Sequence, residues 1–421
     1  MCEEADMEKN YHVCTGCGLL CDDIEVESEK NIVNKVYTAC RVGVAHMTEA
    51  RRGEADFLVD NKHVDEATAI REAASILKNA RNPLIFGLGT STNETQKIAI
   101  ELAKKINATL DDTSSFCLGP LVEALIQDKL KTCTLDDIRN KADVIIYWGT
   151  DPSDSHPRQL SKHTYFPRGS EKQRGWEEER TAIAIDVRKS HTAKICGNYF
   201  FQIPPKGDAE FIDALIAGLS GKLPKTSYNY PPKKLLELAN ILKGAKFGVI
   251  FVGRGLIYSL ENLEPLFKLM KILNEKSNFH LIPMIGNCNT MGFNKNLCEE
   301  TGYVNSVKFE NGNVKHGPEY SVVESLKAKT VDAALVIGSD PLLILPGSIS
   351  KNMLEIPVIS VDHCETLTSK HSKVYINTAI SGVEAGGSAI RMDGVKVSFE
   401  PVIETNHPSE EVILKKIMEA L

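Results

Sequence analysis

The sequence predicts an α/β protein: a small cysteine-bearing module at the N-terminus, followed by two pseudo-symmetric, Rossmann-like α/β lobes. Three observations predict this arrangement. Four of the eleven cysteines fall between residues 14 and 40. Beyond about residue 61, apolar strand-like runs alternate with amphipathic helical runs. Three strand-plus-turn segments each occur twice in the chain, which indicates an internal repeat.

The composition is that of an ordinary globular protein. The chain has 421 residues, of which 42% are hydrophobic and 25% charged, enough for two or three domains. The formal net charge of −7 and the lack of a basic stripe argue against nucleic acid as the main partner. No apolar run reaches the length of a membrane span, and the N-terminus is acidic. Scattered cysteines in an odd number fit a reducing compartment, so we expect a cytoplasmic protein.

The N-terminal module, residues 1–60, is organised around Cys14, Cys17, Cys21 and Cys40, which are spaced C-x2-C-x3-C-x18-C. Thiolates this dense repel one another unless a metal neutralises them. Three close cysteines and one distant cysteine favour a [4Fe–4S] cluster, with one thiolate for each iron, whereas zinc sites favour two C-x2-C pairs. A structural zinc ion and unrelated thiols are the alternatives.

Local sequence supports a compact module around these cysteines. The runs 22–26 and 31–37 alternate in the manner of strands, and a hairpin formed by them would hold Cys21 near Cys40. Gly16 and Gly18 let the backbone wrap closely and present N–H groups to a bound cluster.

The next segment reads as a βαβ unit. Residues 65–80 form an amphipathic run that opens on acidic residues, which predicts a helix. A buried strand at 83–89, a helix at 94–106 and a short strand at 108–110 are predicted after it.

Three such strand segments recur later in the chain. The matched pairs are 84–89 with 247–255, 147–152 with 334–341, and 182–186 with 358–362. Duplication predicts two similar nucleotide-binding lobes. The alternative is that any doubly wound protein repeats its βα units, but the Gly-x-Asp-Pro turn of the second pair is more specific than a generic turn.

The recurring turns place polar groups where open α/β sheets bind phosphates, at the carboxyl ends of strands. The next predicted strand after each Gly-x-Asp-Pro turn ends in an aspartate, Asp186 or Asp362. Its carboxylate can accept hydrogen bonds from ribose hydroxyls or from a guanine edge. The G-x-G-x-x-G fingerprint is absent, so two nucleotide-bearing ligands or one pseudo-symmetric cofactor are predicted rather than one NAD. The turn residues predicted to bind cofactor are Gly149, Thr150, Asp151, Pro152, Gly253, Gly338, Ser339 and Asp340.

Each lobe also has a cysteine in a loop at the predicted ligand edge. Cys117 stands in Ser-Ser-Phe-Cys-Leu-Gly-Pro, and Cys288 stands in Ile-Gly-Asn-Cys-Asn. A cysteine in such a loop is placed to bind a metal ion or to attack a substrate. For either cysteine alone, a buried structural thiol is an equal alternative.

Together these motifs resemble the B-type subunit of formylmethanofuran dehydrogenase, within the bis-molybdopterin-guanine-dinucleotide oxidoreductases that include formate dehydrogenases. The resemblance covers nearly the whole chain. It rests on the segments above and on Ser-His156-Pro-Arg158, Asp186-Val-Arg188-Lys-Ser, Leu-Ile-Pro-Met-x-Gly-x-x-Asn and Gly386-Gly-Ser-Ala-Ile-Arg391-Met-Asp-Gly. It implies two molybdopterin guanine dinucleotides, a [4Fe–4S] cluster on the four N-terminal cysteines, and tungsten or molybdenum bound by Cys117 as the catalytic ligand.

The resemblance also implies a domain organisation and further site residues. Residues 61–116 would join 286–405 in one discontinuous lobe, 117–285 would form the other, and 406–421 would be a C-terminal helix. Arg41 would bridge cluster and pterin, with an exposed surface arginine as an equal alternative. The other residues implied in cofactor binding are His156, Arg158, Asp186, Arg188, Gly286, Asn287, Asp362 and Arg391.

The implied activity is the reversible two-electron reduction of CO2 to formate, with electrons arriving through the cluster. The implied partners are an amidohydrolase subunit that joins formate to methanofuran, a barrel subunit that caps the pterins, and polyferredoxin-type iron–sulfur subunits. A partner is expected because the sequence shows no closing domain after about residue 405.

Two positions depart from the family's pattern. The family has His directly after the metal cysteine and Arg in the Leu-Ile-Pro-Met-x-Gly loop, where this chain has Leu118 and Ile285. Losing both removes a charge-assisted site for a carboxylate. Two alternatives therefore stay open: a structural or electron-transfer subunit that binds cofactors without turning over CO2 or formate, and a zinc-binding, nucleotide-binding protein.

Overall fold

The computed structural model describes residues 11–50, 55–224, 226, 228 and 230–421. Within these residues helices alternate with strands that form several sheets, which confirms the predicted α/β class. Residues 1–10 and 51–54 of the predicted N-terminal module lie outside the described residues. The chain divides into two compact units. One comprises the chain up to Ser115, Asn287–Arg391 and Lys396–Leu421, and the other comprises Phe116–Gly286 and Met392–Val395.

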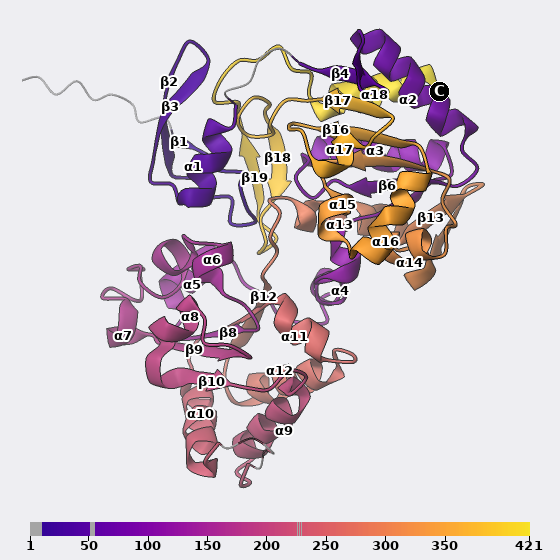
Figure 1. Ribbon diagram of the computed structural model, residues 1–421. Helices are drawn as coiled ribbons and strands as arrows, with labels where there is room; N and C mark the ends of the chain where they lie inside the picture. The colour runs from indigo at the N-terminus through magenta and orange to yellow at the C-terminus, as the bar shows by residue number, and fades with distance from the viewer. Residues whose placement is uncertain (1–10, 51–54, 225, 227, 229) are drawn as a thin grey trace, which may run out of the picture. The chain divides into compact units, whose positions relative to one another are not determined.

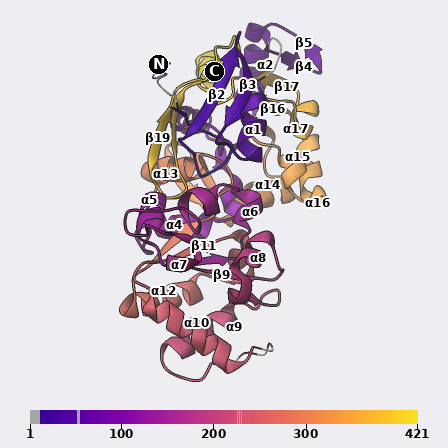
Figure 2. The ribbon, with the colours of Figure 1, turned by 90° about the vertical axis from the view of Figure 1, so that its left-hand side faces the viewer.

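The N-terminal segment of the first unit forms a small antiparallel sheet beside one helix, as Figure 2 shows. Its elements are β1 (Tyr11–His12), β2 (Ile24–Glu29), β3 (Ile32–Tyr37) and α1 (Arg41–Thr48). The predicted hairpin between Cys21 and Cys40 is therefore confirmed. Its tight turn uses Lys30 and Asn31 in the left-handed region, at φ 52° and 58°.

The main sheet of the first unit has nine strands, in the order β14-β13-β7-β6-β15-β16-β17-β4-β5. The five strands from β7 to β17 in this order run parallel, and antiparallel strands flank them. In the same order, the strands are Asn313–His316, Val307–Glu310, Thr109–Asp111, Pro83–Gly87, Ala333–Ile337, Val358–Asp362, Val374–Asn377, Phe57–Val59 and Lys62–His63.

Four helices share one hydrophobic core with this sheet: α2 (Glu66–Asn79), α3 (Asn93–Lys105), α13 (Thr290–Thr301) and α18 (Glu410–Ala420). The predicted helices at 65–80 and 94–106 are confirmed as α2 and α3. Asp65 and Thr92 cap them, accepting hydrogen bonds from the backbone N–H of Thr68 and Thr95.

Short helices and a hairpin complete the first unit. The helices α15, α16 and α17 gather together in the orange part of Figure 1. The hairpin of β18 and β19 packs on the cysteine loop, because Ala389 and Phe399 form a small apolar cluster with Leu20 and Cys288. The remaining elements are α14 (Val322–Lys327), α15 (Pro341–Ile344), α16 (Gly347–Ser350), α17 (Leu367–Lys370), β18 (Gly387–Ile390) and β19 (Lys396–Phe399).

The second unit is built on a five-stranded sheet in the order β10-β9-β8-β11-β12, and every pair in it is parallel. The helices α9, α10 and α12 pack against one another and share an apolar core with alternate residues of the strands (Figure 1). The strands are β8 (Val144–Trp148), β9 (Thr181–Asp186), β10 (Phe200–Gln202), β11 (Gly248–Val252) and β12 (Phe279–Pro283). The helices are α4 (Gly119–Ile126), α5 (Leu135–Lys141), α6 (Pro152–Ser155), α7 (Trp176–Glu179), α8 (His191–Cys196), α9 (Asp208–Leu219), α10 (Pro232–Gly244), α11 (Arg254–Ser259) and α12 (Glu264–Lys276).

The recurring segments occupy equivalent places in the two sheets. The run β6-β15-β16-β17 of the first unit corresponds to the run β11-β8-β9-β10 of the second, strand by strand. Each sheet thus takes strands from both halves of the sequence, so the repeat is not a simple division of the chain into two. No helix in the described part of the chain combines the length and apolar character needed to cross a membrane.

Candidate functional site

The first three N-terminal cysteines lie in one closed loop. Cys14, Cys17 and Cys21 are buried, and the backbone N–H of Cys14 donates to the carbonyl of Cys21 at 2.8 Å. Leu20 adopts a positive φ of 42° inside this loop, and its N–H donates to Cys17. The loop therefore brings three thiols, which lie within eight residues of sequence, into one buried turn.

Cys40 joins these thiols from the start of α1. It is the N-cap of that helix, and its Sγ accepts from the N–H of Gly43 at 3.4 Å. A Cβ on Gly43 would lie 3.1 Å from Sγ of Cys14 and 3.9 Å from Sγ of Cys40. A side chain at this position would therefore crowd the Cys14 thiol.

The other three N-terminal cysteines affect the ionisation of Cys17. Burial raises the pKa of Cys17, and the neighbouring Cys21, Cys14 and Cys40 raise it further. Four thiolates can coexist here only when a cation neutralises them, and four cysteines gathered on one loop and at the start of one helix fit a cluster of metal ions. Arg41, the first residue of α1, is exposed.

A buried polar pair ties the cysteine loop to the rest of the first unit. The Thr15 hydroxyl donates to the carbonyl of Ser381 at 2.7 Å and lies 2.8 Å from Nε2 of His46. Burial, and secondarily the charge of His363, lowers the pKa of His46 to about 4. Since the Thr15 hydroxyl donates its hydrogen to Ser381, it can accept a hydrogen bond from Nε2 of neutral His46.

The turns that follow β8 and β15 have the same geometry. Gly149 and Gly338 adopt φ values of 61° and 54°. Oδ1 of Asp151 accepts from the N–H and hydroxyl of Thr192, at 3.2 and 2.6 Å. Oδ1 of Asp340 accepts from the same two groups of Thr368, at 3.0 and 2.6 Å. Asp151 thus fixes the start of α8, and Asp340 fixes the start of α17 in the same way. Thr150 and Ser339, which precede these aspartates just after the carboxyl ends of β8 and β15, are half-exposed.

Gly253 and Pro152 have packing roles. A Cβ on Gly253 would lie 2.2 Å from the carbonyl oxygen of Gly149 and 2.5 Å from Cβ of Thr150, so only glycine fits. The N–H of Gly255 donates to the same carbonyl at 3.1 Å. Pro152 is buried at the first position of α6.

Asp186 and Asp362, the predicted acidic residues at the ends of β9 and β16, each make contacts with neighbouring residues in the sequence. Asp186 is half-buried, which raises its pKa, and it accepts from the N–H of Arg188 at 3.3 Å. The Arg188 side chain is exposed and reaches within 3.8 Å of Asp151. Asp362 is buried, and its Oδ1 lies 3.1 Å from Nδ1 of His363.

The other residues predicted to bind cofactor differ in how far they are exposed to solvent. Arg391 is buried, Arg158 is half-buried, and Gly286 is exposed with no neighbouring atom within reach of an added Cβ. Asn287 borders a cavity of about 100 Å³ in the first unit, together with Thr15, Gly16 and Cys288. The cavity therefore joins the cysteine loop to residues that the sequence assigned to cofactor binding.

Cys117 is half-exposed, just before α4, in the second unit. A residue that the sequence did not indicate lies beside it: the hydroxyl of Tyr258, on α11, donates to the carbonyl of Phe116. The guanidinium of Arg254 sits 5.7 Å from the centre of the Tyr258 ring. In the sequence, only the Arg-Gly-Leu-Ile-Tyr run that follows the Gly253 turn could have indicated that Tyr258 lies near Cys117.

Full-length similarity decides the family. No protein-family model matches the chain. The B-type subunit of the tungsten-containing formylmethanofuran dehydrogenase 2 of Methanocaldococcus jannaschii is 35% identical, over 97% of this chain and 98% of that protein. The protein of the same name from Methanococcus maripaludis is 34% identical, over 93% of each chain. The chain belongs to the family of B-type subunits of formylmethanofuran dehydrogenase. Members are oxidoreductase subunits.

Solved structures with low sequence identity share the fold. A chain of the formyltransferase/hydrolase complex from Methylorubrum extorquens, solved with methylofuran, matches at TM-score 0.68 and 20% identity, over 86% of this chain and 98% of that one. Acetylene hydratase from Pelobacter acetylenicus matches at TM-score 0.69 and 10% identity, over 98% of this chain and 69% of that one.

The two residues at which this formylmethanofuran dehydrogenase family member departs from the pattern are both buried. Leu118 is 2% exposed and Ile285 is 4% exposed. The carbonyl of Ile285 accepts from Nε2 of His156 at 2.8 Å, and Nδ1 of His156 lies 2.9 Å from the Ser155 hydroxyl. Burial lowers the pKa of His156 to about 4, against the smaller opposing effect of the Ile285 carbonyl. His156, predicted to bind cofactor, is thus a neutral residue that fixes the Ile285 loop.

Replacing His156 with phenylalanine is expected to lower the free energy of unfolding by about 1–3 kcal/mol at pH 7.5, because the Ile285 carbonyl loses its donor. The folded pKa of about 4 lies below the ordinary value of 6.5, so wild type loses stability as the pH falls through that window. The difference between wild type and variant should then shrink by about 1.4 kcal/mol per pH unit below about 6.5.

Denaturant unfolding at pH 7.5 and pH 5.5 measures both effects. His191→Phe, at an exposed position, is the matched control and should change stability by no more than about 0.5 kcal/mol. A His156→Phe difference that is the same at both pH values would contradict the assignment of a neutral buried imidazole.

Proposed function

We propose that the chain is the catalytic subunit of a formylmethanofuran dehydrogenase and carries out the reversible two-electron reduction of CO2 to formate. The observation that carries this proposal is the presence of Cys117 and all four N-terminal cysteines in a chain similar to tungsten-containing relatives over nearly its whole length. A bound tungsten or molybdenum bis-pterin would supply the two-electron redox centre, and a [4Fe–4S] cluster would supply single electrons.

Cys14, Cys17, Cys21 and Cys40 are the residues that would hold the cluster. The burial of Cys14, Cys17 and Cys21, and the position of Cys14 and Cys40 on either side of Gly43, support this assignment. Arg41, next to Cys40, would lie between cluster and pterin. The N–H groups of the cysteine loop and of α1 would donate to the sulfur atoms, as the N–H of Gly43 already does to Cys40.

Two guanine dinucleotide tails are the proposed ligands of the two sheets. The equivalent strand orders and the matching turns at Gly149 and Gly338 support two pseudo-symmetric lobes, 61–116 with 286–405 and 117–285. The residues proposed to contact these tails, or to shape the turns beneath them, are Gly149, Thr150, Asp151, Pro152, His156, Arg158, Asp186, Arg188, Gly253, Gly286, Asn287, Gly338, Ser339, Asp340, Asp362 and Arg391.

Cys117 is the proposed protein ligand of tungsten or molybdenum. Tyr258 would position it, because its hydroxyl holds the carbonyl of the preceding Phe116. Because Leu118 and Ile285 stand where the family has His and Arg, these two positions present no charge to a carboxylate. We propose cytoplasmic partners for the rest of the reaction: an amidohydrolase subunit that takes formate to methanofuran, a barrel subunit that caps the pterins, and polyferredoxin-type subunits that deliver electrons.

Formate is expected to bind weakly, with neutral CO2 as the favoured ligand. An isolated carboxylate costs several kcal/mol to bury without a paired cation, and Leu118 and Ile285 supply none. The measurement is the KM for formate in formate-dependent viologen reduction, compared with a relative that has His and Arg at these positions. We expect the KM to be higher by at least about tenfold, the equivalent of about 1.4 kcal/mol. Equal KM values would contradict this expectation.

The burial of apolar Leu118 and Ile285 also favours a second candidate, a cofactor-binding subunit for structure or electron transfer. Formate oxidation and CO2 reduction by the purified complex, with its tungsten, molybdenum and iron contents, test both functions together. Turnover that scales with tungsten or molybdenum content supports the catalytic subunit. A fully loaded complex that lacks turnover supports the second candidate, and zinc in place of iron and tungsten rejects both.

A further inference from the structure

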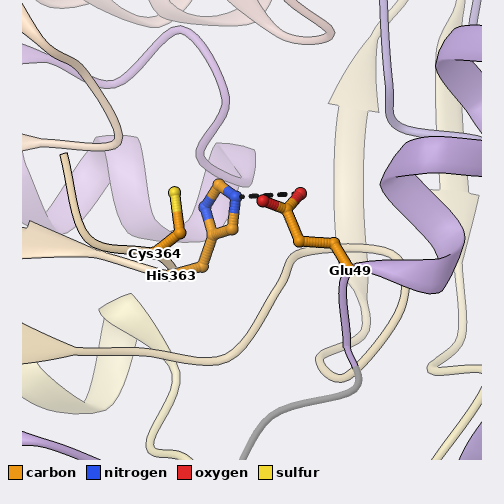
Figure 3. Close-up of side chains that lie close together, drawn as sticks. All are labelled: Glu49, His363 and Cys364. Atoms are coloured by element: carbon orange, nitrogen blue, oxygen red, sulfur yellow. Dashed lines mark ion pairs between the residues drawn. The ribbon is translucent and has the colours of Figure 1, made fainter.

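Three potential metal ligands, none of them one of the four N-terminal cysteines, meet in the first unit. Glu49 directly follows α1, while His363 and Cys364 directly follow β16. One donor atom from each residue lies within 4.8 Å of the other two. Figure 3 shows the three side chains converging, with the His363 ring between the thiol and the carboxylate. A carboxylate, an imidazole and a thiolate together are typical of a zinc site.

The spacing of these groups fits a shared ion better than a direct hydrogen bond. Nε2 of His363 lies 3.6 Å from Oε2 of Glu49, beyond the range of a good hydrogen bond. Zinc bonds of about 2.0–2.3 Å at tetrahedral angles place neighbouring ligand atoms roughly 3.3–3.8 Å apart. The observed separation falls within that range.

The other ring nitrogen of His363 already has the partner that metal-binding histidines use. Nδ1 lies 3.1 Å from Oδ1 of the buried Asp362, which orients the ring and leaves Nε2 as the ligand atom. A carboxylate behind the imidazole is a usual second partner in zinc sites and makes the imidazole a better ligand.

Charge around His363 favours a cation. The carboxylates of Glu49, Asp362 and Glu410 all act on this one imidazole. Glu410 is 7% exposed, and its Oε2 is buried without a hydrogen-bond partner among the described residues. Glu410 and His363 border the same cavity of about 100 Å³. The carboxylates of Glu49 and Asp362 and the sulfur of Cys364 are groups whose negative charge a bound divalent ion would neutralise.

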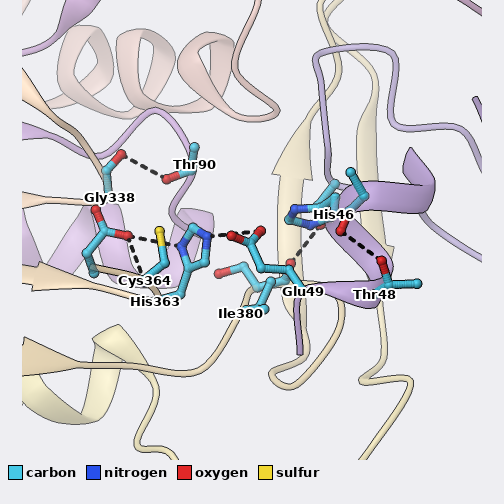
Figure 4. A network of polar contacts seen from close by, with 12 residues as sticks. His46, Thr48, Glu49, Thr90, Gly338, His363, Cys364 and Ile380 are labelled. Atoms are coloured by element: carbon cyan, nitrogen blue, oxygen red, sulfur yellow. Dashed lines mark hydrogen bonds and ion pairs between the residues drawn. The ribbon is translucent and has the colours of Figure 1, made fainter. Parts of the chain in front are cut away.

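We propose that Glu49, His363 and Cys364 bind one zinc ion, with Asp362 supporting His363 from behind. The ion would fasten the end of α1, the helix that Cys40 caps, to the loop after β16. Figure 4 shows His46 and Thr48 of α1 beside Glu49, and His363 and Cys364 on the other side of the junction. Glu49 is exposed, so the ion has a route from solvent.

The competing arrangement is an ion pair without metal. Burial alone would lower the pKa of His363, but its contacts with Asp362, Cys364 and Glu49 raise it, so a protonated ring would bridge the two carboxylates. In that case Cys364 has no essential part, whereas a zinc site requires its thiolate. Loss of the thiol therefore distinguishes the two.

The test is made on the purified complex with its iron in place, treated with a mild chelator and then supplied with Zn²⁺ or Co²⁺. In wild type we expect one zinc per chain more than in Cys364→Ser, His363→Gln or Glu49→Gln, with equal iron in all four. With Co²⁺, wild type should show a thiolate-to-metal absorption band that Cys364→Ser lacks. The apparent zinc affinity should fall by at least about tenfold in each variant.

Cys298→Ser and His371→Gln are the matched controls, because they change the same residue types elsewhere in the first unit. Both should keep wild-type zinc and iron. Zinc content and cobalt spectrum that are unchanged in Cys364→Ser would overturn the proposal. If that variant does not accumulate, Glu49→Gln, at an exposed position, decides by the same zinc count. Since zinc content is measured separately from turnover, the result does not depend on the proposed CO2 chemistry.

Discussion

Cys17→Ala is expected to reduce the iron content from about four atoms per chain to near zero. Cys17 is buried beside the other three thiols, as the effect of Cys14, Cys21 and Cys40 on its pKa shows. Removing one thiolate leaves one iron of the proposed cluster without its protein ligand, so the cluster should be lost. The brown colour and the EPR signal of the reduced protein should disappear together.

The control for this variant is Cys133→Ala, which changes a cysteine of the second unit. It should keep iron, colour and EPR signal at wild-type levels. Iron analysis of anaerobically purified protein makes the comparison. A Cys17→Ala protein that still holds about four irons would reject the cluster assignment, and a protein with zinc but no iron in wild type would support the structural-zinc alternative.

The sequence predicts local structure well here because its signals are local. The caps of α2 and α3 at Asp65 and Thr92, and the apolar runs of the central strands, are set by residues close in sequence. The recurring Gly-x-Asp-Pro turn is also local, and the two copies have matching hydrogen bonds. The assignment of β6 to one sheet and β11 to the other is not local, because it depends on which strands pair after the chain has crossed between units.

The candidate site is predictable only where chemistry and spacing coincide. Three of the cluster cysteines fall in one short motif, so they stand out. The contact of Glu49 with His363 joins residues more than 300 positions apart, and Tyr258 reaches Phe116 over 142 positions, so no spacing could indicate either. His156 adds a contact that its motif did not indicate: its ring nitrogens lie beside the Ile285 carbonyl and the Ser155 hydroxyl, while its binding of cofactor stays a prediction.

Cys117→Ser is expected to lower formate-dependent turnover by at least about 100-fold while leaving the iron content unchanged. Loss of a residue that merely orients a metal ligand costs on the order of 10–100-fold, so loss of the ligand itself should cost at least as much. A serine hydroxyl is a harder and far less acidic ligand than a thiol, so it binds the metal less well at neutral pH. Iron should be unaffected because the four cysteines proposed to hold the cluster belong to the other unit.

The decisive measurement is X-ray absorption at the tungsten or molybdenum edge, together with turnover and metal content. The variant should show one sulfur ligand fewer than wild type, with iron at wild-type levels. Cys133→Ser serves as control, because it makes the same change of thiol to hydroxyl within the second unit and should keep both turnover and the number of sulfur ligands. Unchanged metal–sulfur coordination in Cys117→Ser would show that the metal binds elsewhere. The proposed role of Tyr258 in positioning Cys117 would then also fail, because it requires this thiolate to be the ligand.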